Sequence, residues 1–86
     1  SDIPSSQVDA LDLQGEGVSL AALLVSCDLA SSKGDARRSI EGGGVYVNSL
    51  RVDDTAASVT SAQAIEGRFV LLRKGKKNYH LVAIRR

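Results

Sequence analysis

Three long cations follow one another at helical spacing in the middle of the chain: Lys33, Arg37 and Arg38. Lys33 and Arg37 are four residues apart and share one stripe of a helix, and Arg38 lies beside that stripe. Glu41 lies four residues after Arg37 and three after Arg38, close enough along the helix to neutralise either arginine. Such a stripe can bind the phosphates of a nucleic acid, because each neutralised phosphate releases counterions. The alternative is a solvated helix face, which is the usual role of a charge run.

A second basic cluster lies near the end of the chain, at residues 74–78, where the sequence Lys-Gly-Lys-Lys-Asn predicts a hairpin turn. Cations on a helix and on a nearby hairpin can bracket a phosphate backbone. Lysines at a turn can equally serve solubility, so this cluster alone does not separate the two interpretations. The second group of candidate RNA-binding residues, after the helix cations, is Arg51, Arg73, Lys74, Lys76 and Lys77.

Residues that usually carry catalysis or bind metals are scarce. One cysteine and one histidine, Cys27 and His80, cannot make a zinc site, and we expect both to pack within the fold or, for His80, to lie at the surface. The glycines at 42–44 follow a helix, whereas anion-binding loops precede one. Tyr46 and Tyr79 are candidates for stacking on unpaired bases or for supporting the core. We therefore expect no catalytic activity, cofactor, metal or small-molecule ligand in this chain.

The basic stripe requires a helix that begins after residue 32 and ends at the glycines. Ser32 is the expected N-cap, and Asp35 three residues later completes a capping box with a shorter acid than the usual Glu. Ala36 and Ile40 are four residues apart and should face the core. One of the glycines at 42–44 should adopt the left-handed conformation that ends a helix.

A second helix precedes the basic one. Ser19 is its expected N-cap, and the helix should extend to about Cys27. The short connection at residues 28–31 predicts that the two helices pack as a pair. The apolar stripe that would face the core consists of Leu20, Leu23, Leu24 and Cys27.

Strand patterns fill most of the remaining chain. A two-residue turn at Asn48-Ser49 should join the first two strands, and the basic turn should join the last two. Val8, Ala10 and Leu11 indicate a short strand, and residues 56–66 are compatible with a loop, a short strand or one helical turn. The pattern predicts an α+β fold in which a helix pair packs on a small, mostly antiparallel sheet. The expected strands are residues 45–47, 50–52, 68–73 and 79–84.

The middle third of the chain resembles the small RNA-binding module first described in the fourth ribosomal small-subunit protein. The resemblance implies that module's fold, known as the αL motif. Two positions depart from the family pattern: Ser39 replaces a large aliphatic residue, and Ser49 replaces the Gly that usually follows Asn. The matching positions are Ser32-Lys33, Ala36-Arg37, Ile40, Gly43, Val45 and Val47-Asn48.

The closing hairpin, residues 72–82, resembles the C-terminal end of bacterial-type tyrosyl-tRNA synthetases. In that family the RNA-binding module is a C-terminal appendage. The resemblance implies that the chain holds tyrosine tRNA near its anticodon stem and long variable arm. It further implies a cytoplasmic parent enzyme, an ATP-dependent tyrosine–tRNA ligase. The nucleotide-binding signatures of such an enzyme are not found in these residues, so the partners would be tRNA and the rest of the synthetase.

The composition of the chain fits one small domain. Its 86 residues are 43% hydrophobic but only 3% aromatic, so Leu, Val, Ile and Ala must build the core. The net charge is +1, but residues 1–32 contain five acids and no Lys or Arg, so the cations all lie later. One cysteine excludes an internal disulfide and fits a reducing compartment, and no membrane span or signal peptide is evident. We expect a linker at 1–6 and an RNA-binding domain at 7–86, cut from a longer protein.

Two other kinds of function stay open at this point. The same module could bind ribosomal RNA or target a pseudouridine synthase to its RNA. Alternatively, the chain could be a protein-interaction domain that uses its acidic N-terminal third. Salt-sensitive RNA binding would separate the RNA-binding functions from the protein-binding one.

Overall fold

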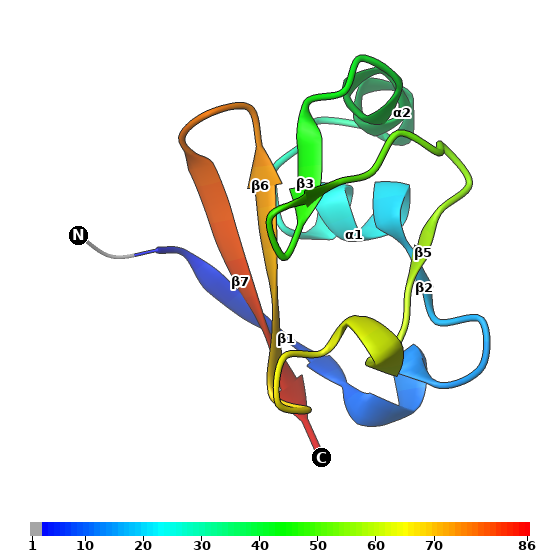
Figure 1. Cartoon of the computed structure of the whole chain (residues 1–86), viewed down its shortest axis with the longest axis vertical. Helices are drawn as coiled ribbons and strands as arrows, with labels where there is room; N and C mark the ends of the chain where they lie inside the picture. Colours follow the sequence, from blue (N-terminus) through cyan, green and yellow to red (C-terminus); the bar gives the residue numbers. More distant parts are fainter. Residues whose placement is uncertain (1–2) are drawn as a thin grey trace.

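The computed structural model describes residues 3–86 and contains a five-stranded sheet with two short helices packed on one face (Figure 1). The strand order is β1-β7-β6-β3-β4, and every neighbouring pair is antiparallel except β1 with β7. A separate two-stranded ladder joins β2 and β5. The predicted α+β fold, with a helix pair on a mostly antiparallel sheet, is confirmed. The elements are β1 (Ser5–Asp9), η1 (Ala10–Leu13), β2 (Val18–Ser19), α1 (Leu20–Ser26), α2 (Lys33–Glu41), β3 (Val45–Val47), β4 (Leu50–Arg51), β5 (Ser58–Val59), η2 (Ser61–Gln63), β6 (Phe69–Lys74) and β7 (Asn78–Arg85).

One aliphatic core lies between the helices and the sheet. Alternate residues of each strand point to opposite faces of a sheet, and Val45, Leu72 and Val82 are on the face that the helices cover, where all three are at most 1% exposed. Ala36 and Ile40 of α2 are completely buried against this core. The core is built without large aromatic residues, as the composition predicts.

The first helix begins and ends as expected. Ser19 Oγ accepts a hydrogen bond from the backbone N–H of Ala22 at 3.3 Å, and this satisfies one of the free donors of the first turn. The last turn closes at Cys27, which is buried. Helix α1 packs against α2, and this contact confirms the predicted helix pair.

The N-terminal cap of α2 differs in one arm from the predicted capping box. Ser32 Oγ accepts from the backbone N–H of Asp35 at 3.1 Å, as expected. The Asp35 carboxylate, however, accepts from the backbone N–H of Ser31 at 2.9 Å and does not return to Ser32. Aspartate is one methylene shorter than the glutamate of a standard capping box, and here it bonds the residue before the cap.

The C-terminus of α2 ends in the glycine run. Gly43 has a φ of +79°, and its N–H donates to the carbonyl of Ile40 at 3.0 Å. The N–H of Gly44 donates to the carbonyl of Ser39, also at 3.0 Å. This pair of bonds is the Schellman motif, so the prediction that one glycine takes the left-handed conformation is confirmed, at Gly43.

We expect Gly43→Ala to lower the free energy of unfolding by about 1 kcal/mol, because a Cβ is disfavoured at positive φ. An added Cβ would meet only the flexible Arg51 side chain, at 3.7 Å, so the penalty comes from the backbone conformation. Gly44→Ala is the matched control, since its Cβ would be in ordinary contact with Ser39 O at 3.6 Å. Urea unfolding of both variants measures the difference, and equal stabilities would contradict the assigned cap.

The turn between β3 and β4 is a primed turn. Asn48 and Ser49 have φ values of 52° and 71°, and positive φ at both central residues is the property of a type I′ turn. The Asn48 side chain also reaches out of the turn. Its Oδ1 accepts from the Leu71 N–H at 2.9 Å, and its Nδ2 donates to the carbonyl of Gln63.

We expect Ser49→Gly to raise the free energy of unfolding by about 0.5–1 kcal/mol, because serine is strained at positive φ and glycine is not. Asn48→Gly is the control at the neighbouring position. It relieves a similar strain but removes both side-chain hydrogen bonds, so it should be neutral or destabilising. Thermal melts compare the melting temperatures of both variants with that of wild type. A lower melting temperature for Ser49→Gly would show that the serine side chain has a stabilising contact.

Several boundaries differ from the sequence prediction. Strand β1 starts at Ser5, so the range 1–6 predicted as a linker overlaps it by two residues, while residues 1 and 2 lie outside the described part of the chain. Residues 56–66 contain both a short strand, β5, and a helical turn, η2. The strand β2 was not predicted. Of the strand expected at Val8, Ala10 and Leu11, only Val8 lies in a strand, because Ala10 and Leu11 belong to the helical turn η1. The domain range 7–86 stays a prediction.

The parallel pairing of β1 with β7 was also not predicted. It sets Ser5 opposite Leu81 and Asp9 opposite Arg85. The strands of the two hairpins agree with their predicted ranges to within one residue at each end. Within residues 3–86, no helix is long and apolar enough to span a membrane.

Candidate nucleic-acid interface

The cation stripe of α2 is exposed. Lys33, Arg37 and Arg38 all lie on the surface, whereas Ala36 and Ile40 of the same helix are buried. None of the three has an ion-pair partner among residues 3–86. The helix therefore presents three charges that are free to meet an anion.

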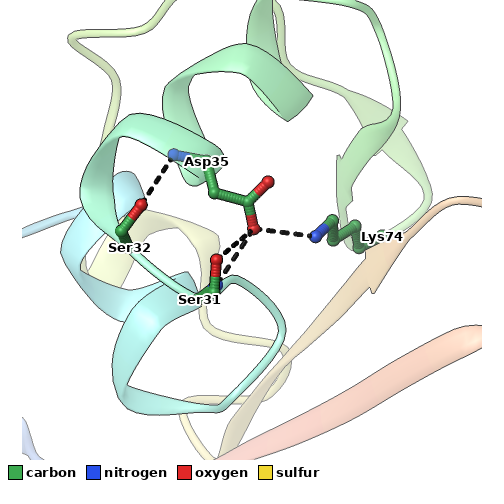
Figure 2. A network of polar contacts seen from close by, with 4 residues as sticks. All are labelled: Ser31, Ser32, Asp35 and Lys74. Atoms are coloured by element: carbon green, nitrogen blue, oxygen red, sulfur yellow. Dashed lines mark hydrogen bonds and ion pairs between the residues drawn. The ribbon is translucent and has the colours of Figure 1, made fainter.

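The second basic cluster is attached to the same helix through Lys74. Figure 2 shows the Asp35 carboxylate directed toward Ser31 and toward the Lys74 ammonium group. Lys74 Nζ lies 3.4 Å from Asp35 Oδ2, which also accepts from the N–H and Oγ of Ser31. The hydrogen bond from the Ser31 backbone, followed by that from Lys74, holds the pKa of Asp35 below its ordinary value. Lys74 thus ties β6 to the first turn of α2.

The far end of α2 contacts the same turn. The N–H of Gly75 donates to the carbonyl of Gly44 at 2.7 Å. Lys74, at the end of β6, is therefore bonded to the first turn of α2, and the β6–β7 turn is bonded to the loop that follows α2. Helix and turn lie together at one end of the molecule (Figure 1). Lys76 and Lys77 in this turn are exposed. The expected nearness of the basic helix and the basic hairpin is confirmed.

Four side chains form a row across the sheet on the face opposite the helices, and we call them the Arg–Tyr row: Arg51, Tyr46, Arg73 and Tyr79. Arg51 is opposite Tyr46, Tyr46 is opposite Arg73, and Arg73 is opposite Tyr79 in the strand registers. The guanidinium carbon of Arg73 lies 3.9 Å from the centroid of the Tyr46 ring and 5.9 Å from that of Tyr79. That of Arg51 lies 5.9 Å from the Tyr46 centroid.

The row has electrostatic consequences at its centre. Hydrogen bonding and charge from Arg51, with a smaller contribution from Arg73, lower the pKa of the Tyr46 hydroxyl. Arg51 also lies against Gly43, at the C-terminal end of α2. Sequence reasoning named all four residues separately but did not group them, because only the strand registers place them side by side.

Other cations of the chain lie elsewhere. Arg85 pairs with Asp9 at 2.7 Å, and Arg86 donates to the carbonyl of Gly67 at 2.9 Å. Strand β7 runs from the basic turn to the C-terminus at the opposite end of the molecule (Figure 1). The acid-free stretch from Arg68 to Arg86 is therefore divided between two ends and does not form one basic surface.

The lone histidine and cysteine belong to the interior. His80 is 6% exposed, and its Nε2 lies 2.9 Å from Ser6 Oγ, which is also 3.6 Å from Cys27 Sγ. Burial lowers the pKa of His80, although the charge of Asp28 acts in the opposite direction. The expected packing of His80 and Cys27 within the fold is confirmed. Among residues 3–86, no three His, Cys, Asp or Glu side chains gather as a metal site.

Comparison with known proteins gives one consistent family. The family model described as "Tyrosine--tRNA ligase SYY-like C-terminal domain" matches residues 1–82. Tyrosine–tRNA ligases from Roseiflexus castenholzii and Opitutus terrae are 45% and 46% identical over 83 residues, which is 96% of this chain and 20% of each relative. The enzyme from Geobacillus stearothermophilus is 44% identical over 69 residues, covering 80% of this chain and 16% of its own length. The chain thus spans about a fifth of the length of these relatives.

Proposed function

Because the chain belongs to the family of tyrosine–tRNA ligase C-terminal domains, we propose that it binds tRNA for a ligase whose catalytic site lies in another part of the protein. The resemblance seen in residues 72–82 is confirmed at the level of the family. The proposal includes the finer expectation that the ligand is tyrosine tRNA, held near its anticodon stem and long variable arm. The rest of the synthetase is the proposed protein partner, and the cytoplasm, where tRNA is charged for translation, is the proposed location.

The observation that supports this function best is that the basic helix α2 and the basic β6–β7 turn lie side by side and are bonded to one another. The helix carries three cations without ion-pair partners in the described chain. Lys74 of β6 bonds its first turn, and the β6–β7 turn, with two exposed lysines, bonds the loop that follows it. Cations that are held on two neighbouring rigid elements can follow the phosphates of a folded RNA. Such an arrangement reads mainly shape and backbone, since side chains cannot enter the deep major groove of an A-form helix.

The proposed phosphate contacts fall into two groups. Lys33, Arg37 and Arg38 are the primary ones, because they are exposed and unpaired within residues 3–86. Lys74 stays among the candidates, but its pairing with Asp35 gives it a structural role as well. The secondary contacts are Arg51, Arg73, Lys74, Lys76 and Lys77.

A salt titration of the chain with tyrosine tRNA tests the function. About four to six phosphate contacts predict a log–log slope of affinity against salt of roughly −3 to −5. Binding that ignores salt, or no binding at low salt, would contradict the proposal and favour a protein-interaction domain. An unrelated structured RNA, such as a ribosomal RNA fragment, serves as the control for selectivity. Tighter binding of the ribosomal fragment would favour the ribosomal alternative.

A further inference from the structure

The Arg–Tyr row (Arg51, Tyr46, Arg73 and Tyr79) is not explained by packing of the core. Tyr46, Arg73 and Tyr79 each adjoin a buried residue along their strand, and Arg51 is opposite Tyr46, so the row stands on the face that no helix covers. Tyr79 is 38% exposed, and the chain has only three aromatic residues to place. A tyrosine ring at such a position adds little to stability. Its position at the end of the row, next to the basic turn, points to a binding role.

The neighbouring side chains order the row. Arg73 lies at cation–π distance from Tyr46 and close to Tyr79. Arg51 approaches Tyr46 from β4, on the other side of β3 from Arg73. The Tyr46 ring therefore restrains two guanidinium groups before any ligand arrives, and this lowers the entropy lost when they bind.

We propose that the Arg–Tyr row is a stacking surface for an unpaired base of the bound RNA. The base stacks on Tyr79 and the guanidinium plane of Arg73, Lys76 and Lys77 hold the flanking phosphates, and Tyr46 is a positioning residue for Arg51 and Arg73. This inference rests on the proposed function, and it adds a ligand class: RNA in which an unpaired nucleotide lies beside a helical stem.

The chemistry of the row favours RNA over a protein partner. Aromatic rings and arginine planes are the groups on which splayed-out bases stack, and every base offers a π-face to them. The row contains two arginines and no acid, and the adjoining turn adds Lys76 and Lys77. A perfect duplex offers this surface only its phosphates, because paired bases are already stacked on one another.

Two synthetic RNAs test the inference: a fully paired duplex, and the same duplex with a bulge of unpaired adenosines. Wild type should prefer the bulged duplex. Tyr79→Leu should lose that preference, with a fall in affinity for the bulged duplex of about 5- to 150-fold, which is the range for one stacked base. Its affinity for the paired duplex and its salt slope should be unchanged, because no charge is lost. Tyr79→Phe, which keeps the ring, is the matched control and should behave as wild type.

Further measurements keep the outcomes distinct. Tyr46→Leu should also weaken the preference for the bulged duplex, because Arg73 loses the ring that restrains it. Tyr46→Phe keeps the ring and should show the same preference as wild type. The fluorescence of an adenine analogue placed in the bulge should be quenched when the wild-type chain binds. This measurement does not depend on any variant being folded. Equal affinity of wild type for the two duplexes, an unaffected Tyr79→Leu variant, or an unquenched analogue would each overturn the stacking surface while salt-dependent binding stood. Failure of both duplexes and of tyrosine tRNA to bind would overturn the proposed function as well.

Discussion

Replacing Lys33 and Arg37 together with glutamate is expected to lower the affinity for tyrosine tRNA on the order of 100-fold or more, since two phosphate contacts become repulsions. The salt slope should become shallower by about two units, one for each lost contact. The fold should survive, because both residues are exposed, unlike the buried Ala36 and Ile40 of the same helix. A filter-binding titration at several salt concentrations measures both quantities, with circular dichroism to monitor folding.

A matched control separates position from total charge. Arg68→Glu with Arg86→Glu makes the same change in net charge near the C-terminal end of β7, where the Arg68 carbonyl accepts from the Ile84 N–H and both side chains are exposed. This double variant should bind nearly as wild type at physiological salt, where charges separated by more than a Debye length are screened. Equal losses in the two double variants would show that only overall charge matters. Unchanged affinity in a folded Lys33/Arg37 variant would remove the helix stripe from the interface.

Gly17→Ala is expected to destabilise the fold by about 3 kcal/mol or more, the largest stability effect of the glycine substitutions considered. Gly17 has a φ of +74°, which alone costs about 1–2 kcal/mol for alanine. A Cβ there would also overlap the carbonyl oxygen of Val59 and come within 2.8 Å of Thr60 Cγ2. The backbone would have to separate β2 from β5, and forced overpacking typically adds 1–3 kcal/mol.

The consequence extends to the helix pair. The residue after β2, Leu20, starts α1 and donates its N–H to the carbonyl of Ala57 at 2.9 Å. Gly15→Ala is the matched control, because Gly15 has a φ of +62° but no atom within 4 Å of an added Cβ. It should lose only the backbone term of about 1–2 kcal/mol. Urea unfolding measures both variants, and similar losses would show that the β2–β5 contact gives way easily.

Local patterns in the sequence determined the elements that carry the basic stripe. The caps of α2 at Ser32 and Gly43 and the primed turn at Asn48-Ser49 depend on residues that are neighbours along the chain. Their conformations follow from side-chain hydrogen bonds to adjacent backbone and from the steric limits on φ. The same is true of the apolar stripe of α1 and the pair Ala36/Ile40, whose spacing on one helix face requires burial.

Family resemblance supplied what these local rules do not contain. The positions matched in residues 32–48 and 72–82 named the correct family, which the comparisons confirm. The net charge of +1 does not by itself point to any class of partner. The order of the C-terminal cations along the chain does not show that they lie at two ends of the molecule. The structure shows it, because β7 runs from one end of the sheet to the other.

Only the tertiary structure decided how distant segments meet. The parallel pairing of β1 with β7, the β2–β5 ladder, the Asp35–Lys74 bond and the Arg–Tyr row all join residues that are far apart in the chain. A local pattern states that a strand forms, but the choice of its neighbour and register depends on which arrangement buries the whole apolar face at once. That choice belongs to the complete core, and it is what gathers separate basic and aromatic residues into one surface.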